Sequence, residues 1–412
     1  MGAFSIPLSG LTASSESLNV IANNLANLNT DGYKNESLSF ADVFNQMQGL
    51  SGNGDPIQLG SGVQVAGQTS NFSNGSVDST GVASNMALQG NGLFVVENNN
   101  QVSYTRAGDF TVNSKGQLCT PQGQLVMGYP AVDGVVSTST ALAPITVNQA
   151  NNIPAVATSS FQMDTNLNAG ASIGDTYSSP ITVYDSLGGS HVLTVQYTNA
   201  GTNSWNYSIS VPAADTGGTG TSTPVATGTL TFNSSGQLTS PTGTVTGITI
   251  SGLADGAATM NLTWNLNDSS GNPTITQQDA TNSTSSNSQN GYGVGTLTGY
   301  SVLSDGTVQG QFSNSQTLAL GQVAIASFAN VQGLEQTGSN DYQATFGSGA
   351  AVIGEAGVGG NGAITGGAVE ESNVSLSAEF ADMIVAQQSY EANAKVLTTL
   401  NQVSQATLQA IS

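Results

Sequence analysis

The stretch SLNVIANNLANLNTDGYK, residues 17–34, combines regularly spaced leucines with five asparagines. Traced back to Leu11, apolar side chains recur at alternating intervals of three and four residues over almost three heptads. That spacing places side chains on one face of an α-helix. Asp31-Gly32 provides a stop signal, because glycine readily adopts the left-handed conformation that ends many helices. The pattern predicts an amphipathic helix at this end of the chain.

The two faces of this helix differ in chemistry. At about 100° per residue, one apolar face of roughly 120° collects Leu11, Leu18, Ile21, Leu25 and Leu28. Asn19, Asn23 and Asn27 lie on the opposite face. Amides can both donate and accept hydrogen bonds, without the several kcal/mol that burying a charge costs. We expect the apolar face to pack on another helix and these asparagines to contact neighbouring chains; a merely solvated amide face is the alternative.

A second helix is predicted at the other end, after the start signal Ser372-Asn373. The helical spacing continues through Leu376, Phe380, Met383, Tyr390 and Leu397. More than 300 residues without a comparable pattern separate the two segments. Because a short isolated helix is marginal in water, we expect the two to pair as a coiled coil, with each other, with copies in neighbouring chains, or both.

The middle of the chain is predicted to be all-β. Residues 92–118 read as short strands joined by turns at Asn-Asn-Asn and Lys115-Gly116, and residues 181–198 read as a hairpin. Trp205 and Trp264 lie in strand-like segments and are expected in the core rather than on a sugar-binding surface. The fold class is therefore mainly β with terminal α.

A composition shift marks out one part of the chain. Residues 149–289 hold seven acidic residues and no Lys or Arg, and Ser/Thr/Asn/Gly-rich runs flank them, which suggests an inserted domain. The predicted parts are a terminal helical domain (1–34 and 370–412), a connector (35–70), an inner β domain (71–148 and 290–369) and an inserted outer β domain (149–289).

Charge and targeting signals exclude several function classes. The net charge is −21, and Lys34, Arg106, Lys115 and Lys395 are the only lysines and arginines. This balance offers no basic patch for nucleic acid or an anionic membrane. The sequence has neither a run of apolar residues long enough to span a membrane nor the features of a cleaved secretory signal. We expect no membrane insertion, and an extracellular location reached by another export route.

The residues give no support to catalysis. Cys119 is the only cysteine and is expected to be a small buried side chain. His191, the only histidine, is expected to face solvent on its strand, because no second histidine or cysteine lies near it to build a metal site. The acidic residues of 149–289 are scattered singly and read as solvated surface. We predict no catalytic residue, cofactor or metal site.

Several motifs resemble one known family. The segment SGLTASSESLNVIANNLANLNTDGYK, with the motif Asn-x-x-Thr-x-Gly-Tyr-Lys at 27–34, and the C-terminal segment 370–403 are similar to the paired end motifs of the flagellar rod and hook proteins. LQGNGLFVV (88–96) and YTRAGDFTVNSKGQL (104–118) resemble the β domain common to that family. Residues 181–198, 228–238 and 318–349 are most similar to its hook members.

The resemblance implies a structural role. Such subunits form a curved, flexible, hollow helical homopolymer that joins rod to filament and transmits torque. The family further implies a distal rod protein, a hook cap protein and a hook-filament junction protein as partners, and export by the flagellar type III apparatus. A flagellar distal-rod protein is the alternative within the family. An extracellular adhesin or carbohydrate-binding β protein is the alternative from another class.

Overall fold

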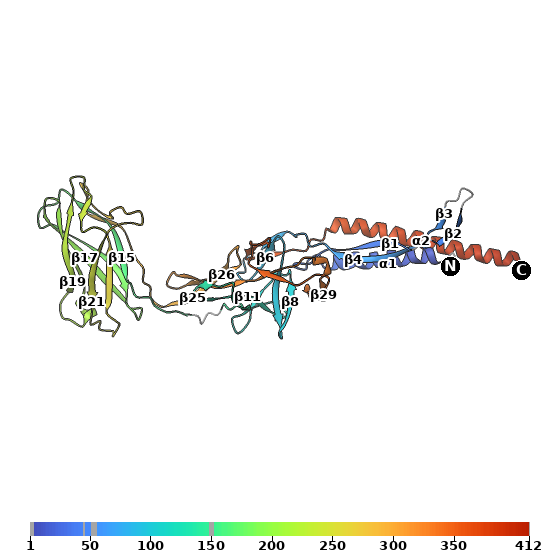
Figure 1. Ribbon diagram of the computed structural model, residues 1–412, viewed down its shortest axis with the longest axis horizontal. Helices are drawn as coiled ribbons and strands as arrows, with labels where there is room; N and C mark the ends of the chain where they lie inside the picture. The colour runs from blue at the N-terminus through green and yellow to red at the C-terminus, as the bar shows by residue number, and fades with distance from the viewer. Residues whose placement is uncertain (1–3, 44–45, 51–55, 148–151, 412) are drawn as a thin grey trace. The chain divides into compact units, whose positions relative to one another are not determined.

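The computed structural model describes residues 4–43, 46–50, 56–147 and 152–411 (Figure 1). The chain divides into two compact units. The terminal unit comprises Met1–Asn148, Gly299–Gln311 and Thr317–Ser412, and the inserted unit comprises Gln149–Thr298 and Phe312–Gln316. One unit therefore contains both ends of the chain, and the other is built almost entirely from one continuous segment.

Two α-helices lie in the terminal unit, α1 (Ser5–Ala26) and α2 (Leu376–Ile411). Between them, the described residues form strands and two short 3-10 helices, η1 (Ala213–Thr216) and η2 (Val331–Gly333). The prediction of helices at the two ends around a β-rich middle is confirmed. Helix α1 ends before the predicted stop, and Gly32, at φ 70°, lies in the turn that follows the helix.

Residues of the predicted connector form paired strands. β1 (Glu36–Asp42) pairs antiparallel with β4 (Val63–Ser70), from Glu36 opposite Ser70 to Asp42 opposite Val63. β2 (Gln46–Leu50) pairs with β3 (Pro56–Leu59). The β1–β4 pair runs alongside α1 and α2 (Figure 1). Where it is described, this segment is a hairpin that packs on the helices.

The β part of the terminal unit is built on one antiparallel sheet with the order β27-β11-β7-β8-β30-β29. Its strands are β27 (Thr317–Val323), β11 (Leu125–Val132), β7 (Leu93–Asn98), β8 (Gln101–Thr105), β30 (Asp341–Gln343) and β29 (Glu335–Gly338). Asn99 and Asn100, both at positive φ, form the tight β7–β8 turn predicted from the Asn-Asn-Asn sequence. Phe94 and Phe110 meet edge to face in the core, with ring centroids 5.1 Å apart.

Shorter strands complete this unit. They are β5 (Val77–Ser79), β6 (Met86–Gln89), β9 (Thr111–Val112), β10 (Leu118–Cys119), β12 (Val135–Val136), β13 (Ala143–Pro144), β28 (Ile325–Ser327), β31 (Val352–Gly354), β32 (Ala363–Gly366) and β33 (Ala368–Glu370). The pairs β5–β33 and β6–β32 join the sequence after the hairpin to the sequence before α2. Cys119 is buried, as predicted. β25 (Gly295–Val302) and β26 (Thr307–Phe312) each include residues of both units.

The inserted unit consists of two sheets that share one core. One sheet contains β16 (Thr176–Tyr184), β17 (Ser190–Gly201), β18 (Ser204–Pro212), β19 (Ser222–Phe232) and β20 (Leu238–Ser240). The other contains β21 (Thr244–Ile250), β22 (Met260–Asn265), β15 (Ser160–Asn168), β23 (Ile275–Gln278) and β24 (Ser283–Gln289). Short β14 (Asn152–Ile153) precedes them. Buried and exposed residues alternate along β17, so alternate side chains enter the core.

Two expectations for this unit have opposite outcomes. Trp205 and Trp264 are fully buried, as predicted for core residues. The prediction that His191 faces solvent is wrong: it is 7% exposed. β16 and β17 form the predicted hairpin, with Val183 opposite His191, and the strand alternation turns position 191 inward. The sequence around His191 did not indicate which face of this strand would pack into the protein and which would face solvent.

Candidate assembly interface

The two terminal helices contact one another in an antiparallel arrangement. Near the start of α1, Gly10 faces Asn393 of α2 so closely that a Cβ at position 10 would lie 2.7 Å from the Asn393 Nδ2. Near its end, the Asn24 Nδ2 donates to the Glu379 Oε1 at 3.2 Å. The two contacts fix the register, since fourteen residues separate them on either helix. The last three turns of α2 therefore extend past the start of α1.

Asn24 is the polar centre of this contact. Its side chain is 1% exposed. The Nδ2 donates to the Glu36 carbonyl at 2.8 Å as well as to Glu379, and the Oδ1 accepts from the Glu36 N–H at 3.0 Å and from the Tyr33 hydroxyl at 3.2 Å. One amide thereby joins α1, the first residue of the hairpin and α2. Burying an amide is favourable only when its donors and acceptors are paired, as they are here.

A buried ion cluster lies next to this contact. The Lys34 Nζ lies 2.7 Å from the Glu370 Oε1, and the Arg106 Nε lies 2.5 Å from the Glu370 Oε2. All three side chains are at most 3% exposed. Arg106 also donates to the carbonyls of Leu88, Gly90 and Gly92. Burial lowers the pKa of Lys34, and the contact with Glu370 offsets part of that shift. The cluster joins the end of the N-terminal motif, the β sheet and the strand before α2.

Two hollows flank α1. One, of about 540 Å³, lies among α1, the hairpin and α2, and its lining includes Ala13, Ile21 and Ala386. The other, of about 690 Å³, lies between α1 and the hairpin, and its lining includes Leu8, Leu38 and Val65. Mostly small or aliphatic side chains line both hollows, with few charges. Such surfaces favour packing against another apolar element over binding a polar ligand.

The predicted apolar residues have different surroundings in a single chain. Ile21 is buried, whereas the other predicted positions on α1 are half-buried: Leu11, Leu18, Leu25 and Leu28. On α2, Met383 and Leu397 are half-buried. The remaining three are 44–50% exposed: Leu376, Phe380 and Tyr390. Further along α2, Val403 and Leu408 are 57% and 68% exposed. Much of the apolar surface of α2 is therefore left uncovered within one chain.

The predicted amide face is largely exposed. Asn19 and Asn23 are exposed and Asn27 is half-buried. The Asn27 Nδ2 donates to the Asn23 carbonyl at 2.9 Å and to the Asn23 Oδ1 at 3.1 Å, and the Asn23 Nδ2 donates to the Tyr33 hydroxyl at 3.3 Å. Two of the three amides therefore already have partners in the same chain.

Sequence reasoning missed the residues that bind the ends of the chain together. These are Asn24, Lys34, Arg106, Glu370 and Glu379. One signal was present: lysine and arginine are almost never fully buried unless paired, and all four cations of this chain lie in the segments that resemble the known family. Nothing in the spacing, however, identified Glu370 as their common partner.

These features define a chain whose two terminal helices pack against one another and leave apolar side chains of α2 exposed. Among the described helices, none is long and apolar enough to cross a membrane. The profile for the family "Flagellar basal body protein FlaE D2 domain" matches residues 152–292, and that for "Flagellar hook protein FlgE/F/G D1 domain" matches 87–183. "Flagella basal body rod protein" matches 6–34, and "Flagellar basal body rod FlgEFG protein C-terminal" matches 365–410. Together they define the rod and hook class of flagellar proteins.

Curated relatives narrow the class. The flagellar hook protein FlgE of Escherichia coli (strain K12) is 36% identical over 417 residues, which cover 97% of this chain and 98% of the relative. That of Treponema pallidum (strain Nichols) is 31% identical over 442 residues, covering 95% and 96%. The chain belongs to the flagellar hook protein family. Its fold resembles the crystal structure of Helicobacter pylori flagellar hook protein FlgE2, with TM-score 0.52 and 16% identity over 70% of this chain and 98% of that one.

Proposed function

We propose that this chain, as a structural subunit of the bacterial flagellar hook, assembles with copies of itself into a curved, flexible, hollow helical tube that links rod to filament and transmits torque as a universal joint. The apolar surface left uncovered on α2 carries the proposal, because exposed apolar surface of this kind marks a site of contact with another protein chain. A repeated contact that does not close into a ring extends into a helical polymer.

In the proposed polymer the two helices pair as a coiled coil within each subunit. The antiparallel register and the half-buried positions Leu11, Leu18, Leu25 and Leu28 support this pairing. Exposed side chains on α2 then pack against neighbouring subunits, Leu376, Phe380 and Tyr390 among them. Asn19 makes polar contacts between subunits. So do Asn23 and Asn27, through the donors and acceptors that their hydrogen bonds within the chain leave unused. Apolar side chains of α2 that are exposed in a single chain thus become covered on assembly, which stabilises the helix.

The proposed domain organisation follows the predicted boundaries. The helices and their flanks (1–34 and 370–412) form the assembly domain, 35–70 connects it, 71–148 and 290–369 form an inner β domain, and 149–289 form an outer one. The compact inserted unit, whose main segment runs from Gln149 to Thr298, supports the last boundary. Weak polar contacts between β domains, rich in Ser, Thr and Asn, suit surfaces that slide as the tube bends.

The remaining partners follow from the family. We assign a distal rod protein and a hook-filament junction protein to the two ends of the tube, and a hook cap protein to its growing end. Export through the flagellar type III apparatus, without a cleaved signal peptide, brings subunits to an extracellular site. The relatives named above are structural proteins, and the proposal includes no catalytic step.

Electron cryomicroscopy of polymer grown from purified subunits tests this function. We expect hollow tubes that curve, with α2 of one subunit packed against its neighbours. Straight, rigid tubes would instead support the distal-rod alternative. Failure to polymerise, together with specific binding on a glycan array, would support an adhesin.

A further inference from the structure

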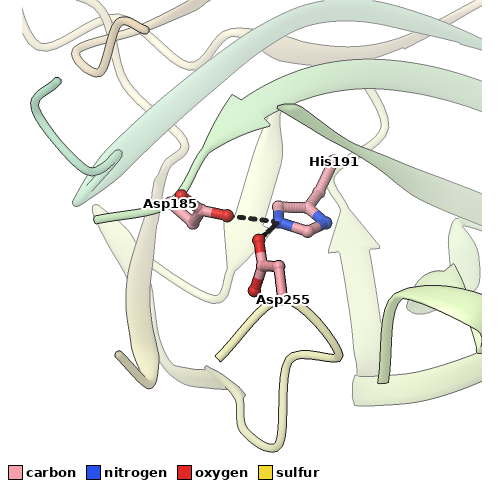
Figure 2. A group of neighbouring side chains, drawn as sticks. All are labelled: Asp185, His191 and Asp255. Carbon is pink, nitrogen blue, oxygen red and sulfur yellow. Dashed lines mark hydrogen bonds and ion pairs between the residues drawn. The ribbon is translucent and has the colours of Figure 1, made fainter. Parts of the chain in front are cut away.

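Three carboxylates from separate parts of the inserted unit converge on one imidazole. Asp185 follows β16, His191 lies in β17, Asp215 lies in η1, and Asp255 lies in the loop between β21 and β22. Figure 2 shows Asp185 and Asp255 on the same side of the His191 ring. The prediction that the acidic residues of this unit are scattered is therefore wrong for these three, because strands far apart in the sequence bring their loops together.

The distances suit a metal ion. The His191 Nε2 lies 2.8 Å from the Asp185 Oδ2 and 3.9 Å from the Asp255 Oδ2, and the three atoms all lie within 4.8 Å of one another. Nitrogen and oxygen ligands of tetrahedral Zn²⁺ lie about 2.0–2.1 Å from the metal, and hence about 3.3 Å from each other. The observed separations fall on both sides of that value. An ion would replace the hydrogen bond between the His191 Nε2 and the Asp185 Oδ2 and would hold the three atoms at about that separation.

The surroundings of the imidazole match a metal-binding histidine. Its other nitrogen, Nδ1, lies 2.9 Å from the Asp215 Oδ2. A histidine that binds metal through one nitrogen commonly donates its other N–H to a carboxylate, which fixes the ring and its tautomer. Asp185 is held similarly, because its Oδ1 accepts the N–H groups of Leu187 and Gly189 at 2.7 and 2.9 Å. The Asp185 Oδ2 is thereby directed toward the ring.

A glycine keeps space open beside the carboxylates. A Cβ at Gly189 would lie 2.5 Å from the Asp185 Oδ2 and 3.1 Å from the Asp255 Oδ2. A side chain there would fill the space next to both oxygens. The Asp185 side chain is fully buried, whereas that of Asp255 is 39% exposed, so an ion and a water ligand can enter from the Asp255 side.

Charge balance points the same way. The residues of the inserted unit include seven acidic side chains but no lysine or arginine. Three of the seven surround a single imidazole; Asp185 is fully buried, whereas Asp215 and Asp255 are 24% and 39% exposed. A buried carboxylate is ordinarily paired with a cation or coordinates a metal. A divalent ion would add positive charge beside Asp185 in a unit without lysine or arginine.

We propose that Asp185, His191 and Asp255 bind one divalent transition-metal ion, of which Zn²⁺ is the representative, and that Asp215 positions His191. This goes beyond the role in assembly. Because the loops of Asp185 and Asp255 come from different sheets, the ion cross-links the two sheets of the inserted unit. One histidine with two carboxylates and an open position fits a zinc-like ion better than the all-oxygen shell that Ca²⁺ or Mg²⁺ takes.

Calorimetric titration of the full-length protein with Zn²⁺ alone, after treatment with a chelator, tests the site. We expect one ion per chain. Asp255→Asn should weaken the affinity at least tenfold, because it replaces a carboxylate ligand with a neutral amide in the most exposed arm of the cluster. Asp279→Asn is the matched control, since it removes an exposed carboxylate of the same unit away from the cluster, and it should stay within twofold of wild type.

The single histidine provides a second measurement. Its imidazole signals in an NMR spectrum arise from one residue only, so they need no assignment. Zn²⁺ should shift them at one equivalent, and equal concentrations of Mg²⁺ should not. Equal affinities for Asp255→Asn, Asp279→Asn and wild type, or Zn²⁺ binding with unmoved imidazole signals, would overturn the proposal and show ordinary surface carboxylates binding the ion.

Discussion

Replacing Asn24 by alanine removes the polar centre between α1, the hairpin and α2. The substitution breaks four hydrogen bonds of a side chain that is 1% exposed. At about 1 kcal/mol each the loss is about 4 kcal/mol, and the higher helix propensity of alanine returns about 0.5 kcal/mol. The expected net cost is about 3.5 kcal/mol for each subunit whose ends are folded.

The assay is the concentration of free subunit that coexists with polymer. If the ends fold only on assembly, about 3.5 kcal/mol raises this critical concentration roughly three-hundredfold, at about 1.4 kcal/mol per factor of ten. If the ends are already folded in the monomer, the same loss lowers the monomer's melting temperature instead. Asn29→Ala, which removes an exposed asparagine after the helix, is the control. Wild-type values of both quantities for Asn24→Ala would refute the reasoning.

Four further predictions concern other contacts of the terminal unit. Leu25→Asp places a charge on the half-buried face of α1 and should abolish polymer in electron micrographs at the subunit concentration at which wild type assembles. Asn23→Ala with Asn27→Ala should lower the polymer melting temperature; an equal or higher value would show a merely solvated face. Glu370→Gln leaves two buried cations unpaired and should cost about 3–5 kcal/mol in urea unfolding, whereas exposed Glu371→Gln should cost little. Burial raises the pKa of Asp341 above its usual 3.8, and the hydrogen bond from Gln124 offsets part of that rise. The free energy of unfolding should therefore fall as pH rises from 3.8 through the raised pKa. Asp341→Asn should flatten this pH dependence and should be more stable than wild type at neutral pH.

Patterns within single elements predicted the elements well. The three-four spacing around Leu18 and Leu25 predicted α1, and alternation predicted the hairpin of β16 and β17. These patterns depend only on local geometry, 3.6 residues per helical turn and two per strand repeat. They indicate which side chains share a face.

Contacts between distant segments could not be predicted in this way. Asn23 and Asn24 are chemically identical neighbours, and only the return of the chain at Glu36 and the arrival of Glu379 decide which of them is buried. His191 is buried for a similar reason, because loops of two sheets close over it. A single sequence contains no signal for contacts between segments that lie so far apart along the chain.

The buried ion cluster also makes the folding of the N-terminal part of the chain depend on a residue near the C-terminus, Glu370. Lys34 is synthesised early, whereas Glu370 follows it more than 300 residues later. Until then, Lys34 and Arg106 lack their carboxylate, and burying them would cost several kcal/mol for each ion. A chain truncated before Glu370 therefore leaves Lys34 and Arg106 without their carboxylate, so this cluster forms only once the chain extends to the strand before α2.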